Sequence, residues 1–120
     1  MQNYHLGDVV LLAFPFAEQQ KVKRRPALVL LDAGDADILV ARITSQDVDT
    51  DYDVRVVEWK RAGLLLPSAI RLHKLATLQK TLVKNKLGTL SSKDLAKTRI
   101  KLQQICGTIG KVNPLVSTKR

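Results

Sequence analysis

Two apolar runs decide the fold: GDVVLLAF at residues 7–14 and PALVLL at residues 26–31. Short continuous runs of aliphatic and β-branched residues predict strands that are buried on both faces. Proline has no N–H to give to a sheet ladder, so we expect Pro26 at the start of the second strand. Residues 15–24 then form a loop. The turn cluster at residues 32–35 predicts a short connection to a third strand.

The chain up to residue 90 carries further strand patterns. Leu39, Ala41 and Ile43 alternate with residues that include Arg42 and Thr44, as expected when one face of a strand is buried. This alternation predicts a third strand over residues 38–46. More β-rich segments follow, and we expect strands at residues 54–59, 68–77 and 86–90.

After residue 90 the pattern changes to that of a helix. Residues 91–94, Ser-Ser-Lys-Asp, resemble a capping box with Asp in place of Glu. Gly107 and Gly110 predict that the helix ends near Cys106. Its apolar stripe consists of Leu95, Leu102, Ile105, Cys106 and Ile109. Six short strands and one helix predict a mainly β, α+β fold: a small antiparallel barrel with a C-terminal helix.

Length and composition restrict the class of protein. A chain of 120 residues with 45% hydrophobic residues suits one domain with its own core. The longest apolar stretch, residues 9–17, is well short of the roughly 18 residues of a membrane span. The N-terminus lacks the pattern of a signal peptide. Cys106, the single cysteine, excludes an internal disulfide and a multi-cysteine zinc site, and its apolar setting favours a core position. We therefore expect a cytoplasmic protein with no membrane partner.

Charge is distributed unevenly along the chain. Residues 1–60 carry a net charge of −3 and residues 61–120 a net charge of +12. This asymmetry indicates a polyanion or an acidic protein as partner, although a solvated basic face explains it equally well. Only 4% of the residues are aromatic, which argues against a platform on which bases stack.

Two other kinds of site receive little support. The four aspartates at residues 47–53, with Glu58 at position 12, resemble a calcium-binding loop, but Tyr52 stands where the required glycine would be. A solvated acidic loop is the better interpretation. His5 and His73 have no nucleophile pattern beside them, and no phosphate-binding glycine loop is present. We therefore expect neither a metal nor a cofactor.

Several segments, taken in order, resemble the PemK/MazF family of bacterial toxins. They are GDVVL (7–11), RRPALV (24–29), ARITSQ (41–46), LPSAIRLH (66–73), ATL (76–78) and KLGTLS (86–91). The resemblance implies an SH3-like barrel of the MazF/PemK/CcdB type, with residues 1–110 as the toxin domain and 111–120 as a basic, flexible tail. It also implies a homodimer. Trp59 and the helix stripe support a dimer, because they offer more apolar surface than one small barrel covers.

The same resemblance implies an activity and partners. Family members are toxins of toxin–antitoxin pairs that cut single-stranded RNA, chiefly mRNA, without a metal. An acidic antitoxin blocks them, and operator DNA is bound only through the antitoxin complex. The family's key arginine precedes the proline of the second strand, which is Arg25 here, and its key hydroxyl is Thr44. Some members carry an arginine and an acid two residues apart on a later strand, where this chain has Arg71 and His73.

The chemistry of metal-free RNA cleavage fits these residue types. The adjacent 2′-OH attacks the phosphorus, so the protein must move protons and stabilise a dianionic phosphorane. A guanidinium such as Arg25 gives paired donors and stays charged. Thr44 can bond a non-bridging oxygen or hold Arg25 in place. Histidine is a common acid or base near neutral pH, so His73 is a candidate for that role if it reaches the site. RNA binding is expected at Lys23, Arg24, Arg42, Ser45, Gln46, Arg71 and Lys74.

Non-catalytic functions stay open at this point. Relatives with the same barrel poison DNA gyrase through a C-terminal helix ending, and an inactive RNA-binding remnant would keep the basic residues without the chemistry. Arg25 distinguishes these alternatives, because cleavage requires it and gyrase poisoning does not.

Overall fold

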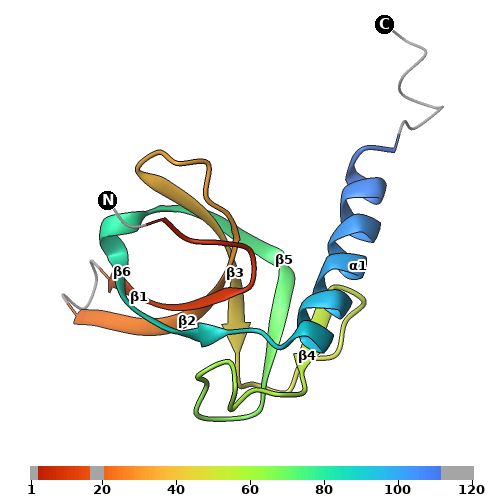
Figure 1. The fold of residues 1–120 in the computed structure, drawn as a ribbon, viewed down its shortest axis with the longest axis horizontal. Helices are drawn as coiled ribbons and strands as arrows, with labels where there is room; N and C mark the ends of the chain where they lie inside the picture. The colour runs from red at the N-terminus through yellow and green to blue at the C-terminus, as the bar shows by residue number, and fades with distance from the viewer. Residues whose placement is uncertain (1–2, 17–20, 112–120) are drawn as a thin grey trace, which may run out of the picture.

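The computed structural model describes residues 3–16 and 21–111, and their elements follow the predicted order (Figure 1). Each expected strand and the expected C-terminal helix is present. The only additional element in these residues is a short 3₁₀ turn between the last two strands. The elements are β1 (Asp8–Phe16), β2 (Lys21–Leu31), β3 (Asp37–Thr44), β4 (Asp53–Val56), β5 (Ser68–Gln79), η1 (Lys80–Leu82), β6 (Val83–Thr89) and α1 (Ser92–Ile109).

The six strands form one antiparallel sheet in the order β4-β5-β3-β2-β1-β6. Figure 1 shows the sheet curling round on itself, with α1 beside β4. The prediction of a mainly β fold with a C-terminal helix is therefore confirmed. The sheet is not closed, however, because its edge strands β4 and β6 do not pair within the described residues.

The segment that follows β4 fills the opening between the two edge strands. Gly63 has φ +84°, and a Cβ at this position would lie 2.1 Å from the backbone oxygen of Leu87 on β6. A Cβ on Gly88 would lie 2.7 Å from the backbone of Ala62. The two backbones touch here because neither glycine has a side chain. The loop after β4 thus packs on β6 without a ladder of hydrogen bonds.

Both faces of β1, of the second half of β2 and of β3 contribute to the core; the apolar runs predict this for β1 and β2, whereas β3 was expected to bury one face. Val9, Leu28 and Ala41 belong to the main core cluster, which also takes up β4, β5 and α1 residues. Their neighbours in sequence point to a second cluster on the opposite face, beneath Tyr4 and η1. That second cluster contains Tyr4, Val10, Leu12, Ala27, Val29, Ile38 and Val40.

The predicted helix start is confirmed, and it also ties the helix to the sheet. The Ser91 side chain accepts a hydrogen bond of 3.2 Å from the N–H of Asp94. The Asp94 carboxylate is fully buried and accepts from the N–H groups of Val57 (3.0 Å) and Glu58 (2.9 Å) at the end of β4. Burial alone would raise the pKa of Asp94, but these bonds and the Lys97 ammonium outweigh it and lower the pKa.

Three details of the strand prediction are wrong. The strand expected over residues 54–59 ends at Val56, and residues 57–60 form a turn. Pro26 lies in the middle of β2, opposite Leu11, and not at the strand's start. The proline is tolerated because β2 pairs with β3 only from Ala27 onward, so no ladder bond is lost on that side. The expected loop over residues 15–24 is shorter, because β1 and β2 pair as far as Phe16 and Lys21.

The helix differs from its prediction at the C-terminal end. It continues past Cys106 to Ile109, and Gly107 lies within it with open space around its Cβ position. Cys106 is exposed, so the core position expected for it is wrong. Ile105, Leu95 and Leu102 make the contact of the stripe with the main core, and Ile109 is exposed.

The remaining expectations about location concern the ends of the chain and the membrane. Within the part of the chain that the structure describes, no helix is long and apolar enough to cross a membrane. Residues 112–120 of the expected basic tail lie outside the described residues.

Candidate functional site

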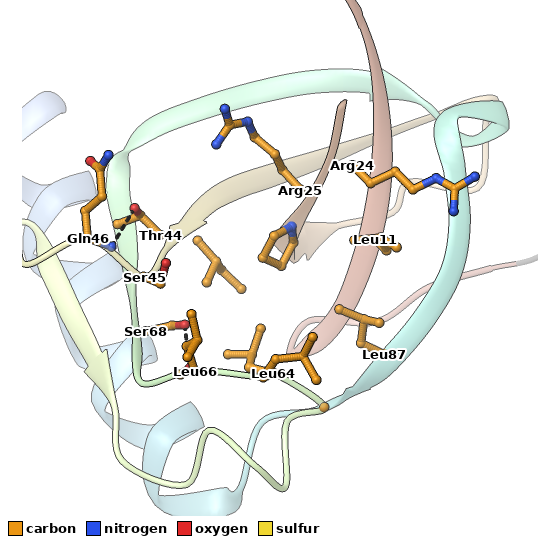
Figure 2. Close-up of a pocket in the computed structure, with 14 residues that line it drawn as sticks. Leu11, Arg24, Arg25, Thr44, Ser45, Gln46, Leu64, Leu66, Ser68 and Leu87 are labelled. Carbon is orange, nitrogen blue, oxygen red and sulfur yellow. Dashed lines mark hydrogen bonds between the residues drawn. The ribbon is translucent and has the colours of Figure 1, made fainter. Parts of the chain in front are cut away.

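One hollow of the described surface, pocket A, lies where β2 and β3 meet the loop that follows β4. It has a volume of about 470 Å³. Leu11, Ile43, Leu64 and Leu87 give it an apolar floor, and polar side chains lie along part of its rim (Figure 2). The polar part of the rim consists of Arg24, Arg25, Thr44, Ser45, Gln46 and Ser68.

Arg25 reaches this rim because of its place in β2. It pairs with Leu12 of β1, one residue before Pro26 and two before pairing with β3 begins. One side of the β2 backbone is therefore free of a strand partner at Arg25 and open to the pocket. Proline also keeps the preceding residue extended. In Figure 2 the side chains of Arg24 and Arg25 diverge, as expected of neighbours on a strand.

Thr44 ends β3 on the opposite side of pocket A. Its side chain is buried, and its Oγ1 accepts a hydrogen bond of 3.1 Å from the N–H of Gln46. This bond turns the chain after β3 and places Ser45 and Gln46 on the rim (Figure 2). On β5, which pairs with β3 at this point, the Ser68 hydroxyl donates to the carbonyl of Leu66 at 2.8 Å. Sequence reasoning did not select the loop around Leu64 and Leu66, because an apolar loop carries no chemical signal.

A second hollow, pocket B, shares Arg25 and Pro26 with pocket A. Its volume is about 420 Å³. Arg42 of β3 and Lys74 of β5 add two further cations to its wall. The rest of the lining is apolar: Ala27, Val40, Leu75 and Ala76. The expected RNA-binding residues Arg42 and Lys74 thus lie together with Arg25.

The sequence matches the family model of PemK-like, MazF-like toxins of type II toxin–antitoxin systems over residues 5–106. This chain is a member of that toxin family. No curated protein matches its sequence significantly.

Solved structures give the same fold for this PemK/MazF toxin. An endoribonuclease from a mycobacterial species matches with a TM-score of 0.69 and 17% identity, over 89% of this chain and 94% of that one. A mycobacterial endoribonuclease in complex with its cognate antitoxin matches with 0.68 and 17%, over 88% and 96%. The MazE–MazF structure from Deinococcus radiodurans (Form-II) matches with 0.69 and 24%, over 85% and 94%.

Three of the expected site residues of the toxin lie outside both pockets. Lys23 is exposed on β2. Arg71 donates a hydrogen bond of 3.0 Å to Asp53. The ring of His73 lies against that of Tyr52, with 5.4 Å between the ring centroids.

The carboxylate of Asp53, in the acidic segment of the toxin, is already bonded to other residues of the same chain. Burial would raise its pKa, but hydrogen bonds from the side chain and backbone of Thr50 and from Arg71 outweigh burial and lower the pKa. Asp47 pairs with Arg55 at 3.5 Å. Within the described residues, no three side chains of His, Cys, Asp or Glu gather as a metal site would require.

The electrostatics of the two pockets differ from those of their surroundings. Arg24, Arg25, Arg42 and Lys74 form no ion pair with the described residues, whereas Arg55 and Arg71 do. No carboxylate lines either pocket within residues 3–16 and 21–111. The two pockets therefore form a cationic surface with an apolar floor, which suits a ligand with phosphate groups and flat bases.

Proposed function

We propose that this toxin is an endoribonuclease that cuts single-stranded RNA, chiefly mRNA, without a metal. The observation that carries the proposal is the position of Arg25 between two carboxylate-free pockets, with Thr44 on the rim of pocket A. A guanidinium that no protein carboxylate neutralises keeps its charge and donors available for a phosphate. The endoribonuclease names of similar structures support the same activity.

The reaction begins at the ribose that precedes the scissile phosphate. The 2′-oxygen forms a bond to phosphorus as its proton leaves, and the bond from phosphorus to the 5′-oxygen breaks as that oxygen gains a proton. The products are a 2′,3′-cyclic phosphate and a 5′-hydroxyl. Arg25 supplies two parallel donors to the phosphorane oxygens, where developing negative charge is greatest. Because it is already held on a strand, little reorganisation is needed during the reaction.

Thr44 acts beside Arg25 in this proposal. Thr44 lines pocket A; its Oγ1 accepts a hydrogen bond from the N–H of Gln46, and its own hydroxyl proton remains to be donated. A hydroxyl there donates to a non-bridging oxygen of the phosphate. The role of His73 in proton transfer stays a prediction from the sequence; its ring lies against Tyr52 and lines neither pocket, so this proposal gives His73 no part in the step.

The remaining residues bind the RNA chain. Arg24, Ser45 and Gln46 extend the rim of pocket A, and Arg42 and Lys74 extend that of pocket B. Contacts of this kind hold the backbone and position the scissile bond between the pockets. Binding by Lys23 and Arg71 stays a prediction from the sequence.

The charge of the chain also indicates its protein partners. We infer an acidic antitoxin, which neutralises the basic C-terminal half, and contact with operator DNA only through that complex. The solved complex of a similar endoribonuclease with its cognate antitoxin supports this partner. We also infer a homodimer and a cytoplasmic location, where mRNA is available.

The test is to incubate the purified protein with a long RNA in EDTA and to sequence the new ends. We expect cuts at a limited set of sites, each with a 5′-hydroxyl, and none with the Arg25→Ala variant. RNA that is bound but never cut would overturn the nuclease and favour the RNA-binding remnant. A protein that neither binds nor cuts RNA but inhibits DNA gyrase would establish the other alternative.

A further inference from the structure

We propose that pocket B is the subsite that recognises one nucleotide next to the scissile bond, and that Arg42, Lys74 and Ala76 determine which base it accepts. The proposal rests on the proposed RNA cleavage and deepens it. The base enters over the apolar floor, and the two cations hold the adjoining phosphate and the base edge.

Pocket B adjoins pocket A at the proposed catalytic residue Arg25. Arg25 and Pro26 line both pockets, so the two hollows are neighbours across a single residue pair. A phosphate bound by Arg25 therefore has one neighbouring nucleotide on the side of pocket A and the next on the side of pocket B. Pocket B, at about 420 Å³, is within the usual range for small-ligand sites.

Charged residues face one another across β3, β5 and β4. Arg42 on β3 lies directly opposite Arg71 on β5, and Arg71 lies directly opposite Asp53 on β4. Asp53 neutralises Arg71 at 3.0 Å, so its carboxylate is not available to Arg42. Two cross-strand arginines thus differ: one is paired, and the other lines pocket B without an ion pair to the described residues. Arg42 has no ion pair with the described residues, and the neighbouring strand β5 carries further cations. This excess of positive charge favours an anionic ligand.

The pairing of β3 with β5 is irregular beside pocket B. Ala41 pairs with Leu75, but the next residue, Arg42, pairs with Arg71. Residues 72–74 are therefore extra on β5, as in a bulge, and Lys74 is turned to the pocket beside Leu75. Leu75 is 44% exposed although it is apolar. An exposed leucine between Lys74 and Ala76 gives a base an apolar surface, and the guanidinium planes of Arg25 and Arg42 give it a second face to stack on.

The test measures base preference and rate separately. A pool of single-stranded RNA with randomised sequence is cut in EDTA, and the frequency of each base around the new ends is counted. The variants are Ala76→Phe, which fills the pocket, and Lys74→Ala, which removes a cation. Lys93→Ala on the outer face of α1 is the matched control, since it removes the same charge far from the pockets. Circular dichroism confirms that each variant is folded.

We expect Ala76→Phe to weaken the preference at one position next to the cut by about tenfold, as the loss of one stacked base would. Lys74→Ala should weaken the same position, and Lys93→Ala should leave every position unchanged. Variants that cut with unchanged base frequencies would overturn the subsite while the nuclease stands. A lower rate with unchanged frequencies would reduce Lys74 to a phosphate contact and also overturn it. A parent protein that cuts no RNA would overturn both proposals.

Discussion

Arg71 donates a hydrogen bond of 3.0 Å to the carboxylate of Asp53, its direct cross-strand neighbour on β4. Both side chains are largely buried, with exposed fractions of 20% and 4%. The pair joins the edge strand β4 to β5, and it separates the arginines of the sheet into two kinds. Arg71 stabilises the fold, whereas Arg42, opposite it on β3, is available to a ligand.

Asp53→Asn should therefore destabilise the protein and leave Arg71 without its anion. We expect the free energy of unfolding in urea to fall by about 1–3 kcal/mol, because a largely buried cation loses the anion that neutralises it. The matched control is Asp47→Asn, whose carboxylate pairs with Arg55 but is 98% exposed. That variant should change stability by less than about 1 kcal/mol. Equal effects of the two variants would contradict a structural role for the Arg71–Asp53 pair.

Arg25→Ala should abolish RNA cleavage and leave the fold intact, because Arg25 has no ion pair with the described residues and lies outside both core clusters. Removing one preorganised donor from a developing oxyanion costs roughly 10²–10³ in rate. Arg25→Lys should restore only part of the rate, since an ammonium cannot give two parallel donors. The control is Arg99→Ala on the exposed side of α1. Single-turnover cleavage rates measure all three, and full activity in Arg25→Ala would place catalysis elsewhere.

His73→Ala separates the sequence-based role of this histidine from its position in the structure. Its ring packs on Tyr52 and lines neither pocket, so we expect a small loss of rate and an unchanged pH profile. Removal of a general acid or base would instead cost roughly 10²–10⁴ in rate and remove a limb of the profile near neutrality. Cleavage rates between pH 5 and 9 decide the matter, and loss of that limb would establish His73 as the proton-transfer group.

The pattern of apolar residues was enough to predict the order of strands along the chain, because continuous apolar runs such as those of β1 and β2 fit few other structures. It was also enough for the N-cap at Ser91. The true end of α1 was missed, because Gly107 meets no neighbour and costs the helix too little to stop it. Pro26 was misplaced for a tertiary reason: β3 begins to pair one residue later.

The candidate site was predictable only in part. Residues close in sequence, such as Arg24 with Arg25 and Thr44 with Gln46, stay together on one rim. The bulge in β5 could not be derived from a period of two, and it sends Lys74 to pocket B while His73 lies against Tyr52. The partner of Arg71 likewise depends on how β4 aligns with β5, which local sequence does not determine.

The protein should be a homodimer in solution. Trp59, which first suggested excess apolar surface, packs against the main core. Large apolar side chains are exposed elsewhere, and Leu65 and Leu66 beside pocket A are exposed by 91% and 58%. Neighbouring exposed leucines are typical of contact surfaces. Light scattering at micromolar concentration should give twice the monomer mass of 13.4 kDa. A particle of monomer mass that does not grow on concentration would contradict the dimer.

Acid should weaken the fold through Asp32. Its carboxylate receives Lys80 Nζ at 2.8 Å and the N–H of Tyr4 at 2.7 Å, so it ties the N-terminal segment to η1. The hydrogen bond from Lys80, followed by that from Tyr4, lowers the pKa of Asp32 from 3.8 to about 2. The unfolded chain therefore takes up this proton first as the pH falls. The stability that Asp32 contributes is complete above its unfolded pKa and is lost as the pH falls from about 4 towards 2.

Asp32→Asn tests this link between charge and stability. The amide cannot neutralise the buried Lys80 ammonium, so we expect the variant to be less stable than the parent at pH 7. Because Asp32 no longer titrates, the stability of the variant should also fall less steeply between pH 4 and pH 2. Asp49→Asn, at an exposed position, is the control and should follow the parent curve. Urea unfolding at each pH gives the curves; parallel curves for Asp32→Asn and the parent would show that this carboxylate is not the group that titrates.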